Sequence, residues 1–156
     1  MKTDEIIKTY RFKSTDLTPE TVIAMTVVDV ASDICDDAYA YFPDLDSYGL
    51  IVYSLKNDDS WRLRHSYFHL EPLAANMKVG GVKFQWYDGI FSGALTDINS
   101  DGFRDFIFHS MAGFNLYNVS TRILRDKDLA ARSFHDEDFK VSEVTFCFLF
   151  ILDSQS

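Results

Sequence analysis

The chain has 156 residues, a length typical of one domain or of a piece of a larger protein. Its 24 acidic residues outnumber its 15 lysine and arginine residues, which gives a net charge of −9 at pH 7. Because contacts to phosphate need clustered basic side chains, this composition argues against a nucleic-acid partner and against an anionic-membrane partner. Hydrophobic residues make up 47% and aromatic residues 15% of the chain, so it has enough apolar surface to bury a core.

The first part of the chain is predicted to form an antiparallel sheet. Short β-branched, apolar or alternating runs of strand length cover residues 21–30, 38–42, 50–55 and 61–65. Turn-forming residues separate these runs at Pro43-Asp44, Ser47-Tyr48-Gly49 and Lys56-Asn57-Asp58-Asp59. Tight turns between consecutive strands predict one four-stranded meander.

A second set of strands is predicted over residues 89–95, 103–109 and 114–119. The segment between the two sets, from Ser66 to Tyr87, has fewer strand signals and is predicted to be a long connection. The spans DAYAYFPD…GLIVYSL and RDFIFHSM…FNLYNVS resemble each other weakly. Repeated antiparallel four-stranded sheets predict an all-β fold, namely a partial β-propeller of about two blades.

Two blades cannot close a ring, and repeat architectures usually need about three repeats for stability. We therefore interpret residues 1–141 as part of a larger propeller and expect two blades alone to be insufficient. Residues 142–156 are set apart as an aberrant hydrophobic C-terminal tail. The apolar run in this tail, from Val144 to Leu152, is about half the roughly 20 residues that a membrane-spanning helix needs. Met1 is followed by Lys2-Thr3-Asp4-Glu5, so no secretory signal is visible.

One loop has the spacing of a metal site. Asp97, Asn99 and Asp101 place side-chain oxygens at alternate positions before Gly102, as at the start of a calcium-binding loop, and the later Asp105 would complete the set. The alternative is a polar hairpin turn in which Asp101-Gly102 supplies a positive φ angle.

Two residues are candidates for covalent modification. Asn118-Val119-Ser120 is an N-glycosylation sequon, whose use requires a secretory route, and the alternative is a chance tripeptide. Cys35 and Cys147 are the only cysteines, too few to define a disulfide framework. The histidines have the chemistry to bind metal or carry protons, but the sequence assigns no catalytic arrangement and no ligand-binding residues.

Several blocks between Asp36 and Arg125 resemble the yellow and major royal jelly protein family of insects. These blocks are YGLIVYSL, SWRLRHSYF, EPLAANMKVGGVKFQW, DGIFSGALT and VSTRILRD. The resemblance implies a secreted, extracellular, six-bladed propeller of which this chain would hold an inner part. It also implies that Cys35 is a disulfide cysteine whose partner lies outside this chain. Because the family has a similar turn without the full acidic set, the polar turn is preferred over calcium, and no cofactor is predicted.

The resemblance also implies alternative functions. The first is a part in cuticle pigmentation through conversion of dopachrome-like melanin intermediates, an isomerase-type reaction that needs a base and donors for a developing oxyanion. The second is binding of a biogenic amine or another small aromatic ligand, which the acidic charge would favour. A nutritive secreted protein and a non-functional truncated product are the remaining alternatives.

Overall fold

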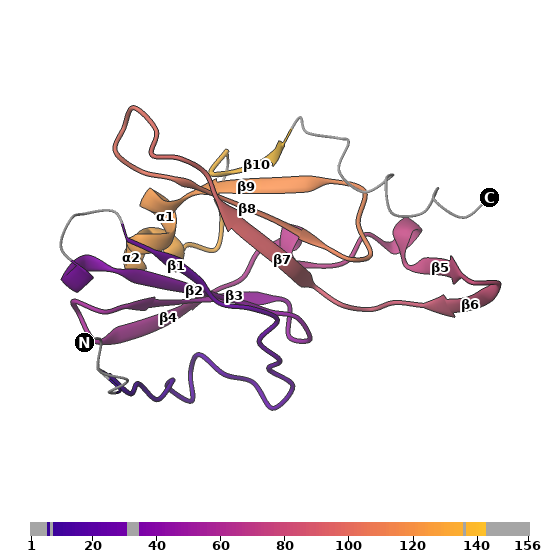
Figure 1. The fold of residues 1–156 in the computed structure, drawn as a ribbon, viewed down its shortest axis with the longest axis horizontal. Coiled ribbons are helices and arrows are strands. Elements are labelled where there is room, and N and C mark those ends of the chain that lie inside the picture. The colour runs from indigo at the N-terminus through magenta and orange to yellow at the C-terminus, as the bar shows by residue number, and fades with distance from the viewer. Residues whose placement is uncertain (1–5, 7, 31–34, 136, 143–156) are drawn as a thin grey trace, which may run out of the picture.

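The computed structural model describes residues 6, 8–30, 35–135 and 137–142, which form two antiparallel four-stranded sheets and a separate hairpin (Figure 1). The structure is mostly β, so the predicted antiparallel four-stranded sheets are confirmed, although the chain also contains short helices. The described strands form no closed sheet, so the propeller itself stays a prediction.

Sheet 1 has the strand order β1-β2-β3-β4 and is the predicted meander. Its strands are β1 (Val27–Asp29), β2 (Tyr39–Asp44), β3 (Gly49–Ser54) and β4 (Asp59–Leu63). Tyr48 and Asp58 close the two tight turns with positive φ angles of 52° and 47°. The strand predicted over residues 21–30 is reduced to Val27–Asp29, with one isolated bridge from Ile23 to Asp44.

Sheet 2 has the order β10-β9-β8-β7. Its strands are β7 (Ile90–Leu95), β8 (Asp105–Ser110), β9 (Leu116–Ser120) and β10 (Phe139–Ser142). Two short helices that the sequence did not predict, α1 (Thr121–Arg125) and α2 (Lys127–Ala130), lie between β9 and β10. The Ser120 and Asp126 side chains accept backbone N–H groups at the starts of α1 and α2 and so cap them.

The connection between the sheets contains more structure than predicted. Three 3-10 turns lie along the chain, η1 (Cys35–Asp37) before β2, and η2 (Ser66–Phe68) and η3 (Pro72–Ala74) after β4. Strands β5 (Asn76–Val79) and β6 (Val82–Gln85) then form a hairpin that extends away from both sheets (Figure 1). Gly80 and Gly81 have φ angles of 56° and 85°, as a two-residue hairpin turn of the primed type requires.

The two sheets pack face to face around one core. In β8, Phe106 and Phe108 alternate with half-buried residues and point toward sheet 1. From sheet 1, Tyr41, Leu50 and Val52 reach the same cluster, and each is completely buried. Because the buried aromatic and aliphatic side chains come from both sheets, the core belongs to neither sheet alone.

An N-terminal segment, residues 8–22, covers the opposite face of sheet 1. Tyr10 packs on Tyr53 with ring centroids 4.4 Å apart, and Phe12 packs on Phe42 at 5.0 Å. Beneath this segment, Ile51 has no exposed surface. Sheet 1 is therefore covered on both faces.

Candidate functional site

A buried ionic cluster joins the two sheets at the end of β1. The Asp29 carboxylate, which is 0% exposed, accepts hydrogen bonds from Arg125 at 2.6 Å and from the Tyr41 hydroxyl at 3.0 Å. The Nε atom of Arg104 lies 3.4 Å from the other carboxylate oxygen. Asp29 and Tyr41 belong to sheet 1, whereas Arg104 precedes β8 and Arg125 ends α1. The cluster therefore fixes the position of sheet 2 and its helices relative to sheet 1.

Burial and mutual contact set the protonation of this cluster. Burial, and then the neighbouring Asp29 carboxylate, raise the pKa of Tyr41 well above its usual range, so the hydroxyl keeps its proton and donates it. Burial by itself would lower the pKa of Arg125, but hydrogen bonds to Asp29 and Tyr41 leave that pKa raised. Arg125 is consequently a fixed positive charge.

Arg125 also lines a hollow of about 720 Å³ at this end of the molecule. Its guanidinium carbon lies 4.9 Å from the centroid of the Tyr39 ring and 5.7 Å from that of Phe103, both within cation–π range. The hollow is lined by aromatic, cationic and acidic side chains, namely Asp37, Tyr39, Phe103, Arg122, Arg125, Asp126, Lys127, Asp128 and Leu129. This mixture has the chemistry to hold a small aromatic ligand that carries charged groups.

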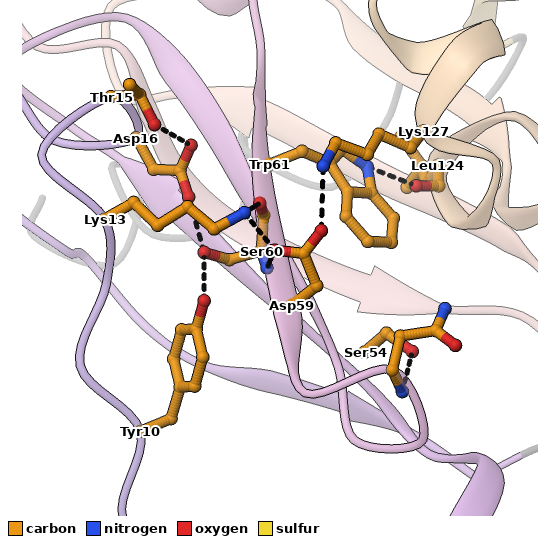
Figure 2. Close-up of polar contacts among 11 residues, drawn as sticks. Tyr10, Lys13, Thr15, Asp16, Ser54, Asp59, Ser60, Trp61, Leu124 and Lys127 are labelled. Atoms are coloured by element: carbon orange, nitrogen blue, oxygen red, sulfur yellow. Dashed lines mark hydrogen bonds and ion pairs between the residues drawn. The ribbon is translucent and has the colours of Figure 1, made fainter.

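The helices that supply most of these residues are held against β4, as Figure 2 shows. The Trp61 indole N–H donates to the Leu124 carbonyl at 3.0 Å, and Lys127 donates to Asp59 at 2.8 Å. Lys13 of the N-terminal segment contacts the same carboxylate. Hydrogen bonds from Lys127 and Lys13 lower the pKa of Asp59 to about 2. Sheet 1, the N-terminal segment and α2 therefore meet at Asp59.

The predicted glycosylation residue, Asn118, lies in β9 on the face of sheet 2 that is turned away from the shared core. Its side chain is half-buried and lines a hollow of about 240 Å³ together with Asp105 and Lys140. A further hollow of about 460 Å³ runs along the β5–β6 hairpin, and none of the described residues that line it is acidic. Glycosylation of Asn118 stays a prediction.

The loop Asp97–Asp105 has the geometry of a turn. Gly102 has a φ angle of 84° and donates to the Asn99 carbonyl at 3.0 Å, while the Phe103 amide donates to the Asp101 carboxylate at 3.1 Å. The Asn99 side-chain amide donates a hydrogen bond of 3.3 Å to the Asp105 carboxylate at the end of the loop. Within the described residues, no three His, Cys, Asp or Glu side chains gather closely enough to hold a metal ion. The loop is therefore arranged as the preferred polar turn, and calcium binding, the alternative, is untested.

Cys35 is exposed in η1 and is a free thiol among the residues that the structure describes. Cys147 and the rest of the predicted tail beyond Ser142 lie outside the described residues. The expectation of a disulfide from Cys35 to a partner beyond this chain is therefore untested.

Sequence analysis missed the residues that form the cluster and the hollow. Asp29 carried a signal, because it is a charged residue within the apolar run Val27-Val28-Asp29-Val30, and buried charges are normally paired. Its partner Arg125 lies 96 residues away, so no local pattern could identify the pair. The described helices, of five and four residues, are too short to cross a membrane.

Comparison with known sequences decides the family. The family model described as "Major royal jelly protein" matches residues 1–155. The chain belongs to the major royal jelly protein family. Among curated members, Protein yellow from Drosophila yakuba is 46% identical over 138 residues, which cover 87% of this chain and 25% of that protein. L-dopachrome tautomerase yellow-f from Drosophila melanogaster is 41% identical over 136 residues, which cover 87% of this chain and 32% of that relative. The resemblance inferred from the sequence blocks is confirmed, and this family member spans about a quarter to a third of the length of these curated relatives.

Proposed function

We propose that this member of the major royal jelly protein family is part of a secreted, extracellular, yellow-type β-propeller that converts dopachrome-like intermediates and so contributes to cuticle pigmentation. Similarity to a relative named L-dopachrome tautomerase yellow-f supports the reaction class. The structural observation that carries the proposal is the hollow beside Arg125, where two aromatic rings and three cationic side chains line one volume.

The residues of the hollow suit such a substrate. Dopachrome is a small, flat, oxidised indole ring that carries a carboxylate. The ring faces of Tyr39 and Phe103 can stack on it, and Arg122, which is exposed, can pair with the carboxylate. Arg125 is already engaged by Asp29 and supplies a fixed positive charge next to the rings.

The reaction moves two protons from ring carbons to the two quinone oxygens, so it needs a base. Three carboxylates line the hollow, at Asp37, Asp126 and Asp128. The Asp126 carboxylate caps α2, because it accepts hydrogen bonds from the backbone N–H groups of Asp128 and Leu129. We therefore assign the base to Asp37 or Asp128, and the adjacent cations would stabilise the developing oxyanion.

The test is the loss of dopachrome absorbance in the presence of the 156-residue chain, compared with buffer. Arg122→Gln removes one charge-assisted hydrogen bond and should lower the rate about tenfold. Lys78→Gln, which changes an exposed cation of the β5–β6 hairpin outside the hollow, should leave the rate unchanged. A rate equal to that of buffer, from a chain with the circular dichroism of a β protein, would contradict the proposed reaction.

The acidic residues of the same hollow favour one alternative, the binding of a biogenic amine. Three carboxylates in a chain of net charge −9 would attract an ammonium group. Calorimetric titration with dopamine and serotonin separates the two functions. Heat of binding that Asp128→Asn abolishes, without turnover of dopachrome, would identify a binding protein.

A further inference from the structure

A serine and a histidine lie opposite each other on the face of sheet 2 that is turned away from the shared core. An irregularity in β7 between Ile90 and Ser92 shifts the register, so that Ser92 pairs with His109 of β8. Because Phe106 and Phe108 point into the shared core, His109 and its partner occupy the other face. Both side chains are half-buried, so they retain contact with solvent.

The hydrogen bonds of this pair orient the imidazole ring. Ser92 Oγ lies 2.5 Å from His109 Nε2, and His109 Nδ1 lies 3.0 Å from the Ser110 carbonyl oxygen. A carbonyl oxygen can only accept, so in the neutral ring Nδ1 carries the proton and Nε2 accepts the Ser92 hydroxyl. A nucleophile, a base and a group that orients the base are thus arranged in sequence.

A backbone donor follows the serine directly. β7 is an edge strand, and the Gly93 N–H donates to the sulfur of Met25 at 3.0 Å, which is a weak acceptor. A Cβ atom at Gly93 would lie 2.5 Å from the Phe106 ring, so the position requires glycine. An oxyanion formed next to Ser92 would be a stronger acceptor than the sulfur and could take its place, as in esterases whose oxyanion donor is the amide after the nucleophile.

We propose that Ser92 and His109 form a nucleophilic dyad that hydrolyses small esters. Ser92 Oγ bonds to the carbonyl carbon while its proton moves to His109 Nε2. The bond from this carbon to the alcohol oxygen breaks, and the alcohol leaves with that proton. Water then attacks the acyl-serine and gives a proton to Nε2. Ser92 recovers the proton as the acid departs. This activity is separate from the reaction proposed for the hollow at Arg125 and does not depend on it.

The alternative role of the pair is structural, because a cross-strand hydrogen bond stabilises a sheet without any chemistry. The two roles differ in the reactivity of Ser92 Oγ. A fluorophosphonate reacts with a serine that a base activates and leaves ordinary serines unmodified.

The experiment treats the 156-residue chain with a fluorophosphonate probe and maps the adduct by mass spectrometry. We expect one adduct, on Ser92, and hydrolysis of p-nitrophenyl acetate that stops when the adduct forms. Ser92→Ala should abolish both signals, and His109→Gln should slow labelling at least about 100-fold. Ser100→Ala, in an exposed loop, is the matched control and should label like the parent chain.

Labelling before and after unfolding in urea requires no variant. A native dyad loses its reactivity when the chain unfolds. No adduct on Ser92 in the native chain, equal labelling after unfolding, or an unchanged rate in His109→Gln would each overturn the proposal.

Discussion

Asp29 is a residue at which substitution should weaken the contact between the two sheets. Its carboxylate is completely buried and holds Arg125 at 2.6 Å, and Arg104 is within ion-pair distance. Removing one partner of such a pair leaves an uncompensated charge in the interior, which typically costs about 3–5 kcal/mol. Replacing both partners by apolar residues avoids that charge.

We therefore expect Asp29→Ala to lower the free energy of unfolding by about 3–5 kcal/mol, and Asp29→Ala with Arg125→Met to recover part of the loss. Urea denaturation followed by circular dichroism measures both values. Lys56→Ala removes an exposed pair with Asp37 at 4.0 Å and should change stability by less than about 0.5 kcal/mol. An Asp29→Ala chain as stable as its parent would contradict the assigned role of the cluster.

His65 makes the stability of the chain depend on pH. Its ring stacks on Phe139 at 4.0 Å, and its Nδ1 accepts the Tyr67 N–H at 3.1 Å, which requires an unprotonated nitrogen. Burial, and then the neighbouring His135, lower the pKa of His65 from 6.5 to about 4. The unfolded chain consequently takes up this proton at a higher pH than the folded chain. The stabilisation is complete above about pH 6.5 and is lost as the pH falls toward 4.

Protonation of His65 between pH 7 and pH 4 should lower the free energy of unfolding by about 1–2 kcal/mol. This is less than the full pKa shift would give, because the ring is only partly buried and solvent screens its charge. His65→Asn keeps a side-chain acceptor for the start of η2 but does not titrate in this range. The melting temperature of this variant should therefore depend less steeply on pH, whatever its absolute value. Equal slopes for the variant and its parent would assign the pH dependence to other groups.

At the scale of elements, the hydrophobic periodicity of the sequence predicts those strands that bury one face. Phe106, Phe108 and Ser110 alternate with half-buried residues, and this alternation marked β8 in the sequence. Helices α1 and α2 span too few residues to show a helical period, so only their caps, Ser120 and Asp126, could have indicated them. Strand β10 is paired with β9 across two intervening helices, a long-range contact that no local pattern reports.

The β5–β6 hairpin was missed because its side chains are nearly all exposed, so it lacks the buried face on which strand prediction relies. The sequence feature that could have indicated this hairpin is its turn, because Gly80-Gly81 suits two consecutive positive φ angles. The residues of the candidate site were missed for another reason. The end of β1, the loop before β8 and the end of α1 meet only in the folded chain.

The hairpin should open without loss of the core. Gly81→Val places a β-branched residue at a φ angle of 85°, which should unpair β5 from β6. We expect hydrogen exchange of residues 76–85 to accelerate, while the melting temperature of the core shifts by no more than about 2 °C. Gly81→Asn is the control, because asparagine tolerates positive φ better than valine. A large fall in the melting temperature would show that the hairpin supports the sheets.

At the scale of the whole molecule, the two sheets differ in how completely they are covered. Ile51, on the outer face of sheet 1, is fully buried under the N-terminal segment. Ile107, on the corresponding face of sheet 2, is only half-buried. In the propeller proposed for the larger protein, a neighbouring blade would pack there. This asymmetry supports the proposal that this chain is part of a larger ring.

The cooperativity of unfolding decides whether two sheets are sufficient for a stable fold. Because Phe106 and Phe108 pack against Tyr41 and Leu50, neither sheet keeps its core when the other unfolds. The shared core therefore predicts one transition, in contrast to the sequence-based expectation that two blades are insufficient. Trp61 is 6% exposed and reports the core, whereas Trp86 follows the hairpin. In a Trp86→Phe variant, tryptophan fluorescence and far-ultraviolet circular dichroism should change at the same urea concentration. Two separate midpoints would show that the sheets unfold independently. A gradual change without a transition would support the expectation from repeat architecture that further blades are required.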